Sequence, residues 1–479
     1  MINKSVSTNI GEEKKKKKFK FSMKMPHTYV LLSCILIAVA IMANIIPSGE
    51  FQRVQDAVSG KMVVVPGTFE VMAKNYFGIF DLFMAVQKGF VDAADIIFFI
   101  IFAYGFVFML IKNGTFDAVL GTLIRKLGNK IQLMIPVCML TFGVLGATMG
   151  LYEEAYGLLP VFIGMAVALG YDAVLGGAIV FIGVSTGFSA AIMNPFTVGV
   201  AQQIAGVPLM SGVGFRTICF VVFMSASILY TWRYAIKIKN DPTKSVLYGV
   251  ELENTKTANK DELINKRLTT GHKLCGIAFI ITIITLLYGT MELEWYINEL
   301  AALFLMMMII VGKIGGFTFT EIANTLVEST KSMTFGILVC GFSRAVLMVM
   351  KDAQITDTIV HFIASLLEGR STYTAALGML GAQNFINFFI TGSTSQASIT
   401  MPIMAPVAEI IGLNKQIAVL AFQFGDGFSN MFWPTVVAFE CGLMGIPINK
   451  WYKFIAPLFG IMFGLQVIMM IIAVAIGFC

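Results

Sequence analysis

The sequence carries one pattern twice, half a chain length apart. A Gly-Phe-Ser tripeptide with a proline after it occurs in both halves, and two further stretches recur with it. The matched pairs are Lys112–Asp117 with Lys351–Asp357, Pro160–Gly170 with Pro402–Gly412, Gly187–Ser189 with Gly427–Ser429, and Pro195 with Pro434. Counted between first residues, the offsets are 239, 242, 240 and 239. Four collinear matches at a nearly constant offset indicate an internal duplication.

The composition indicates that this chain folds in a lipid bilayer. Of its 479 residues, 57% are hydrophobic and only 13% are charged, whereas a soluble domain carries about 25% charged residues. The apolar stretches, such as 29–46, 96–111 and 461–476, are continuous runs rather than short strands of alternating polarity. The sequence therefore predicts an all-α polytopic membrane protein.

Several function classes lack the residues that they need. The seven cysteines and three histidines are scattered singly, without the spacing of a disulfide framework or a zinc site. No P-loop, dinucleotide-binding glycine pattern or metalloprotease helix motif occurs. We therefore expect no enzyme and no cofactor, and leave open a coupling Na⁺ or H⁺. The basic run 14–18 reads as a cytoplasmic tail rather than a nucleic-acid contact.

The apolar segments divide into spans and interrupted hairpins. The predicted spans, some of them broken, are 28–47, 93–112, 172–205, 216–238, 274–290, 297–313, 332–350, 413–445 and 451–476. Segments 131–169 and 371–411 each place a polar centre between two half-length helices. We interpret both as re-entrant hairpins, because irregular backbone at membrane depth survives only inside protein or beside a water-filled cavity.

Basic residues predict the orientation of the chain. With the lysine tail in the cytoplasm, loops 113–130 and 239–273 fall on the same side. The same count sends 93–112 inward and 332–350 outward, so the two halves form an inverted repeat. An interfacial amphipathic helix is expected near 77–91. The predicted organisation in the cytoplasmic membrane is a basic cytoplasmic tail 1–25, a first repeat 26–238, a cytoplasmic linker 239–273 and a second repeat 274–479.

Four stretches carry polar residues at predicted membrane depth. They are the hairpin centres 146–154 and 391–398 and the span breaks 185–197 and 425–435. Glycine and proline interrupt the helix there, which frees backbone groups and positive half-helix N-termini to bind an ion or an anionic group. Paired, interrupted segments in two related halves are typical of a secondary transporter. Any single serine or threonine here is as easily explained by a hydrogen bond to its own helix.

Carboxylates at membrane depth are the stronger functional signal, because each costs about 2.5–3.5 kcal/mol there. Glu153, Glu154 and Asp426 lie in the predicted breaks; the alternative is that the hairpin tip lies nearer to water. Glu440, like Glu409, lies nearer a span end and is expected at the interface. Arg344 either neutralises one of these acids or extends toward the membrane surface.

Several motifs resemble one known family over nearly the whole chain. They are Pro26–Leu31, Ile46–Phe51, Val65–Gly67, Gly146–Thr148 with Glu153-Glu154, Gly170–Asp172 and, the most specific, Asn194–Gln202. On these residues the chain resembles the YfcC-like branch of the anaerobic C4-dicarboxylate carrier (DcuC-type) family, within the ion-transporter superfamily.

The resemblance implies a homodimer in which each protomer moves a transport domain against a scaffold, as an elevator. It also implies that the hairpin tips and broken helices hold the substrate and often sodium. The implied substrate-binding residues are Thr148, Glu153, Glu154, Asn194, Thr197, Ser393, Thr394, Ser395, Asp426 and Asn430. A sodium ion would lie near Ser189, Asn194, Ser429 and Asn430. Both tips lack the Ser-Asn-Thr motif that is typical of dicarboxylate-carrying members.

The acids favour a cationic substrate, since a dicarboxylate site would instead need Arg or Lys. The branch also resembles basic amino-acid antiporters. The predicted function is therefore exchange of basic amino acids such as arginine and ornithine, with the substrate carboxylate on a half-helix N-terminus. The alternative is a sodium- or proton-coupled carrier of C4-dicarboxylates or other organic anions. An intramembrane enzyme and a passive channel fit the sequence less well. Expected partners are the small-molecule substrate, membrane lipid and a second copy of the chain.

Overall fold

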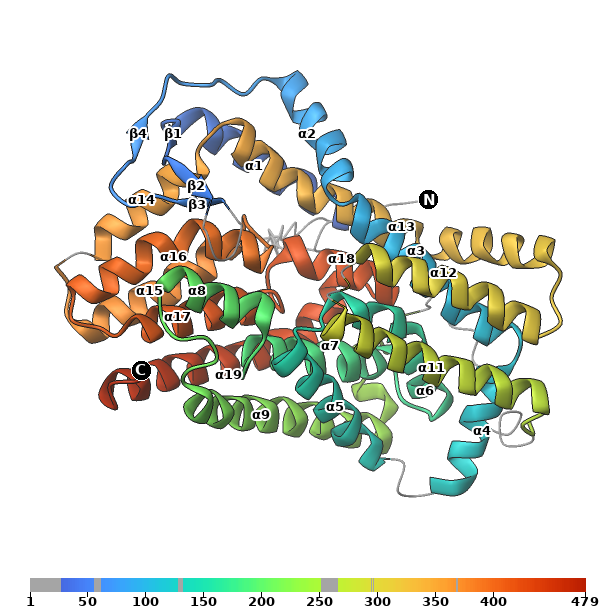
Figure 1. Ribbon diagram of the computed structural model, residues 1–479. Coiled ribbons are helices and arrows are strands. Elements are labelled where there is room, and N and C mark those ends of the chain that lie inside the picture. The colour runs from blue at the N-terminus through green and yellow to red at the C-terminus, as the bar shows by residue number, and fades with distance from the viewer. Residues whose placement is uncertain are drawn as a thin grey trace, which may run out of the picture.

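The computed structural model describes residues 27–55, 62–127, 132–250, 266–293, 295, 297–367 and 369–479. The predicted basic tail and residues 251–265 of the predicted linker lie outside these residues. Helices dominate the first half (Figure 1), in the order α1 (Thr28–Ile45), α2 (Ile79–Asp92), α3 (Ala94–Lys112), α4 (Thr115–Leu127), α5 (Met134–Met149), η2 (Glu153–Leu158), α6 (Leu159–Ala168), α7 (Ala173–Ser189), η3 (Pro195–Gly199), α8 (Val200–Ala205), α9 (Val213–Asn240) and η4 (Pro242–Lys244).

The second half is also helical. Its helices are α11 (Thr270–Glu292), α12 (Ile297–Ile314), α13 (Phe319–Asp352), α14 (Thr356–Leu367), α15 (Thr372–Asn387), α16 (Ser393–Ile410), α17 (Lys415–Ser429), α18 (Pro434–Met444) and α19 (Ile448–Ala475). Among the described residues, α1, α3, α9, α12, α13 and α19 are long and apolar enough to cross a membrane. The prediction of a helical membrane protein is confirmed.

The interrupted segments are helical on both sides of each break. Segment 131–169 contains α5 and α6 with a turn and the 3₁₀ helix η2 between them, and segment 371–411 contains α15 and α16. Pro195 and Pro434 each begin a new helical segment, where the N–H that proline lacks has no partner within the helix. The predicted span 332–350 lies within the continuous 34-residue helix α13, which begins earlier than predicted, at Phe319. The amphipathic helix predicted near 77–91 is α2.

Helices α7 and α17 form the centre of the molecule. Every residue of α7 is buried, and α17 is buried from Gln416 to its end. Helix α7 packs against α5, α6, α9 and α17, while α17 packs against α15, α16 and α19. In Figure 1, α15, α16 and α17 lie together on the left and α6 lies on the right. The long helix α13 packs against α1, α2, α3 and α18.

The entries to α7 and α17 are built alike. The side chain of Asp172 accepts from the backbone N–H of Leu175 at the start of α7, and Asn414 accepts from that of Gln416 at the start of α17. Such caps satisfy N–H groups that have no partner within the helix. A glycine in the left-handed region stands two residues before each cap, Gly170 with φ +77° and Gly412 with φ +83°.

Four short strands follow α1. Strand β1 (Gly49–Glu50) pairs antiparallel with β4 (Glu70–Val71), and β2 (Arg53–Gln55) pairs antiparallel with β3 (Met62–Val64). The ammonium of Lys74 donates to the carbonyls of Ala43 and Ile46 at the end of α1. Partial burial of the ammonium lowers the pKa of this lysine. These contacts hold the strands against the end of α1.

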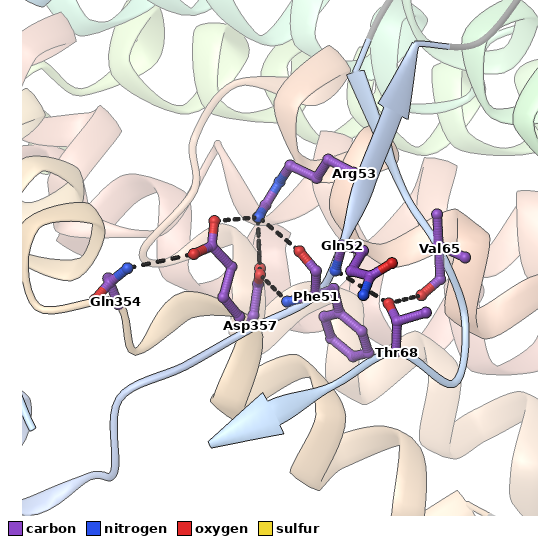
Figure 2. A network of polar contacts seen from close by, with 8 residues as sticks. Phe51, Gln52, Arg53, Val65, Thr68, Gln354 and Asp357 are labelled. Atoms are coloured by element: carbon purple, nitrogen blue, oxygen red, sulfur yellow. Dashed lines mark hydrogen bonds and ion pairs between the residues drawn. The ribbon is translucent and has the colours of Figure 1, made fainter. Parts of the chain in front are cut away.

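A polar network joins the strands to α14 (Figure 2). Both carboxylate oxygens of Asp357 accept from the Arg53 guanidinium, at 2.9 and 2.8 Å, and one also accepts from the backbone N–H of Phe51 at 3.0 Å. The side chain of Asp357 is 3% exposed and that of Arg53 is 30% exposed. This ion pair therefore links the strands to α14 through a buried carboxylate.

Replacing Asp357 by asparagine is expected to lower the free energy of unfolding by about 2–3 kcal/mol, because it removes the buried carboxylate partner of Arg53 and leaves only the more exposed Glu50. The thermal midpoint of the purified protein in detergent measures this. The matched control is Asp352→Asn, which removes the more exposed ion pair between Asp352 and Lys88. It should lower the free energy of unfolding by only about 0–1 kcal/mol. Equal midpoints for the two variants would show that the network does not stabilise the fold.

Candidate functional site

A cavity of about 330 Å³ lies where the helix breaks meet. This volume is at the small end of the range of about 300–1,000 Å³ that ligand pockets occupy. Both hairpin tips and the breaks after α7 and α17 contribute to its wall, together with the start of α3 and the middle of α13. The polar and glycine residues that line it are Asp92, Asp95, Gly150, Tyr152, Glu153, Glu154, Tyr156, Ser343, Arg344, Thr391, Gly392, Ser393, Thr394, Ser395, Asn430 and Thr435.

The charges on the cavity wall are unequal. The lining residues include four carboxylates, from Asp92, Asp95, Glu153 and Glu154, and one basic group, the Arg344 guanidinium. A nitrogen of that guanidinium lies 3.9 Å from a carboxylate oxygen of Asp92, at the edge of ion-pair distance. The excess of acids is the chemical environment that a cationic ligand requires.

One part of the wall is suited to an anionic group instead. Helix α16 begins at Ser393, and no side chain caps its N-terminus. Its first-turn N–H groups belong to Ser393, Thr394 and Ser395, all of which line the cavity. The Arg344 guanidinium lies 3.9 Å from the place that a Cβ on Gly392 would take. A guanidinium beside a helix N-terminus is a receptor for a carboxylate.

The tip of the first hairpin requires glycine. Gly150 ends α5 in the left-handed region with φ +73°. A Cβ at this position would lie 2.4 Å from the side-chain oxygen of Asn194. The same Asn194 oxygen accepts from the N–H of Phe196 at 2.9 Å and so caps η3. Because of this contact, the first hairpin tip lies directly against the break after α7.

The structure brings six of the ten predicted substrate-binding residues to the cavity wall: Glu153, Glu154, Ser393, Thr394, Ser395 and Asn430. Asp426 lies behind the wall, fully buried, and accepts from the Ser393 hydroxyl at 2.5 Å. Asp426 belongs to the last turn of α17, whereas the sequence suggested a position in the break after this helix. Thr148, Asn194 and Thr197 do not line the cavity, and Thr148 donates to the carbonyl of Val144 in its own helix at 2.7 Å.

The residues predicted near a sodium ion fall into two groups. The Asn387 amide nitrogen lies 2.6 Å from the Ser429 hydroxyl, 2.7 Å from the Asn430 side-chain oxygen and 2.9 Å from the Asp426 carbonyl. Ser189 instead packs against Gly427, where a Cβ would lie 2.4 Å from the Ser189 Cα. Among the described residues, no cluster of three or more His, Cys, Asp or Glu side chains could hold a metal ion. The sodium site stays a prediction.

Sequence reasoning missed several residues of the cavity. Asp92 ends α2 and Asp95 lies in the first turn of α3, both outside the four polar stretches. The sequence signal for them was a pair of acids beside an apolar run. Arg344 lies near Asp92, an acid that the sequence did not single out as its partner. The expectation of an interfacial Glu440 was wrong, because this side chain is fully buried. Glu409 is 68% exposed and pairs with Lys415 at 3.0 Å, as an interfacial acid would.

The fold and this cavity define a helical membrane protein of the transporter class. The comparison with protein families is more specific: the model of the C4-dicarboxylate anaerobic carrier family (DcuC) matches residues 25–475, and the chain belongs to this family.

Two relatives match most of the chain. It is 30% identical over 494 aligned positions to the Escherichia coli (strain K12) protein named "Putative basic amino acid antiporter YfcC", with 95% of this chain and 97% of that protein covered. It is 29% identical to an uncharacterized protein of Haemophilus influenzae, with 88% and 83% covered.

Two solved structures are similar at lower identity. Neisseria gonorrhoeae MtrF, described as one of a class of antimetabolite efflux pumps, is 17% identical with a TM-score of 0.44, over 94% of this chain and 96% of MtrF. The Alcanivorax borkumensis YdaH transporter is 14% identical with a TM-score of 0.41, over 94% and 99%.

Proposed function

We propose that this protein is a secondary active transporter of the cytoplasmic membrane that exchanges basic amino acids such as arginine and ornithine. The observation that carries the proposal is the composition of the cavity wall, four carboxylates against one guanidinium. The name of the Escherichia coli relative, which is 30% identical, points to the same substrate class. The protein would work as a homodimer with its N-terminus in the cytoplasm.

The cavity wall offers partners for both charged groups of a basic amino acid. The α-carboxylate would bind at the N-terminus of α16 and at Arg344, where N–H donors and a positive charge meet. The cationic side chain would lie among the acids, with Glu153 and Glu154 on the first hairpin tip. Charge-assisted hydrogen bonds at both ends would select for a substrate that carries both groups.

The repeated positions of the helices support an inverted repeat. Helix α5 (134–149) and helix α15 (372–387) have equal lengths and are 238 residues apart, while α9 (213–240) and α19 (448–475) are 235 residues apart. Gly170 and Gly412, with φ +77° and +83°, are 242 residues apart. In Figure 1 the second hairpin, together with α17, and α6 of the first hairpin lie on opposite sides of α7. Such a pair of halves would enter the membrane from opposite faces and move as an elevator.

A carrier of C4-dicarboxylates or other organic anions is the second candidate. It is favoured by the description of the family and by Arg344 beside the uncapped N-terminus of α16. In that case Glu153 and Glu154 would bind a coupling ion rather than the substrate. The two candidates therefore assign the same acids to different ligands.

Exchange in proteoliposomes separates the candidates. Vesicles loaded with unlabelled arginine, ornithine or succinate would be placed in trace radiolabelled arginine or succinate, with and without sodium. Basic amino-acid exchange predicts that labelled arginine accumulates against internal arginine or ornithine, and that internal succinate gives only the signal of protein-free vesicles. Accumulation of succinate, dependent on sodium or pH, would replace the first candidate by the second.

A further inference from the structure

Glu440 is a buried acid that the proposed substrate site does not use. It lies in α18, its side chain has no solvent exposure, and it is not among the residues that line the cavity. One carboxyl oxygen accepts from the hydroxyls of Tyr152 and Tyr156, at 3.2 and 3.1 Å. The other oxygen has no hydrogen-bond partner among the described residues. Among the described residues, Glu440 also forms no ion pair with a basic side chain.

This environment favours a neutral carboxyl group at rest. A buried carboxylate without a nearby cation is unstable, because two neutral O–H donors replace only part of its hydration. The unpartnered oxygen is fully enclosed, and a metal ion would need several more oxygen ligands than it offers. A proton is the cation that fits there without rearrangement of the surrounding side chains.

The two tyrosines connect this acid to the cavity. Tyr152 and Tyr156 line the cavity while their hydroxyls donate to Glu440, and Ser185 of α7 donates to the Tyr152 hydroxyl at 3.2 Å. Both tyrosines belong to the first hairpin tip, directly beside the proposed substrate-binding acids Glu153 and Glu154. A ligand that moves the hairpin tip therefore changes the hydrogen bonds that hold Glu440.

Other titratable groups surround this network, one of them a permanent cation. Helices α13, α19, α6 and α1 pack against α18, and η2 contacts it through the tyrosines. Besides the three groups of the network, the titratable or charged groups on these elements and on α17 are Glu153 and Glu154 of η2; Tyr29 and Cys34 of α1; Glu321, Glu328, Lys331, Cys340, Arg344, Lys351 and Asp352 of α13; Lys415 and Asp426 of α17; Cys441 of α18; and Lys450, Tyr452 and Lys453 of α19; α6 has none. Arg344 is already directed to Asp92 and to the N-terminus of α16.

We propose that Glu440 is a proton-binding site coupled to the substrate cavity through Tyr152 and Tyr156. This inference rests on the proposed function, because it takes the ligand of the cavity to be cationic. When the cationic ligand binds, its positive charge favours loss of the proton from the Glu440 carboxyl. The proton passes to cavity water, and the carboxylate that remains keeps the two tyrosine O–H donors. Proton and substrate then oppose each other's binding by the same factor.

Titration calorimetry of arginine binding to the purified protein tests the inference. Measurements in two buffers with different enthalpies of ionisation give the number of protons released per arginine bound. The wild type should release a fraction of a proton that passes through a maximum as the pH rises. Glu440→Gln should bind arginine without this release, and Glu409→Gln, at an exposed acid outside the cavity, should behave like the wild type.

Tyr156→Phe keeps the ring in the cavity wall and removes one donor to Glu440. Loss of that donor disfavours the carboxylate, so the maximum of proton release should move to higher pH. This variant keeps the test decisive if Glu440→Gln does not fold. Undiminished release from Glu440→Gln, or an unshifted maximum in Tyr156→Phe, would overturn the proton site. Failure of the wild type to bind arginine would instead refute the proposed function.

Discussion

Joint replacement of Glu153 and Glu154 by glutamine is expected to abolish measurable arginine binding. Two unit charges about 4 Å apart interact with about 4 kcal/mol at the effective dielectric constant of a protein surface. Loss of both carboxylates should therefore weaken binding by at least about 100-fold, since about 1.4 kcal/mol corresponds to a factor of ten. Equilibrium binding of labelled arginine to the purified variant measures this. Glutamine keeps the acceptor for the N–H of Tyr152, which Glu154 now supplies at 3.0 Å, so the hairpin tip should stay intact.

The matched control for the double variant is Glu409→Gln. It also removes an acid, but one that is 68% exposed and paired with Lys415 away from the cavity, so arginine binding should stay within about twofold of the wild type. Single variants should lie between the wild type and the double variant. Undiminished arginine binding by a folded double variant would contradict the role of these two acids as the receptor for the cation. If this variant lost succinate transport as well, Glu153 and Glu154 would instead bind a coupling ion.

The sequence was sufficient to predict the class of fold and several of the segments that line the cavity. Hydropathy predicted a helical membrane protein, because long apolar runs have one stable form in a bilayer. Glycine and proline marked the breaks, and the structure brings both hairpin tips to one cavity with Glu153, Glu154 and Ser393 on its wall. The breaks could be predicted because they depend on local backbone chemistry, which is visible in a short stretch of sequence.

The remaining residues of the site depend on packing between distant segments. Asp92 and Asp95 reach the cavity because α2 and α3 pack against α13, which carries Arg344. Position along a span suggested an interfacial Glu440, but α13 covers α18 and two tyrosines of the first half cover its carboxyl group. Thr148 shows the converse, since its hydroxyl bonds within its own helix although it stands in a predicted site motif. No local pattern encodes such contacts.

Replacement of Arg344 by glutamine is expected to weaken arginine binding by about 30-fold or more, the loss of a charge-assisted hydrogen bond worth roughly 2–3 kcal/mol. The reason is its place beside Gly392 and the uncapped N-terminus of α16, where the substrate carboxylate is proposed to bind. Agmatine, which is arginine without its carboxyl group, gives a direct comparison. It should bind to the wild type more weakly than arginine does, and its affinity should not fall in the variant. Competition of each compound against labelled arginine, or calorimetry, provides both affinities.

Lys351→Gln is the matched control for this variant. Its ammonium lies 3.9 Å from Asp92, the same separation as that of the Arg344 guanidinium, but it is 54% exposed and does not line the cavity. If Arg344 acted only by neutralising Asp92, the two variants should have similar effects, and agmatine and arginine should respond alike. If Arg344 binds the carboxylate, only Arg344→Gln should remove the preference for arginine over agmatine. Equal losses for the two compounds would therefore place the carboxylate elsewhere and leave Arg344 as a partner of Asp92 alone.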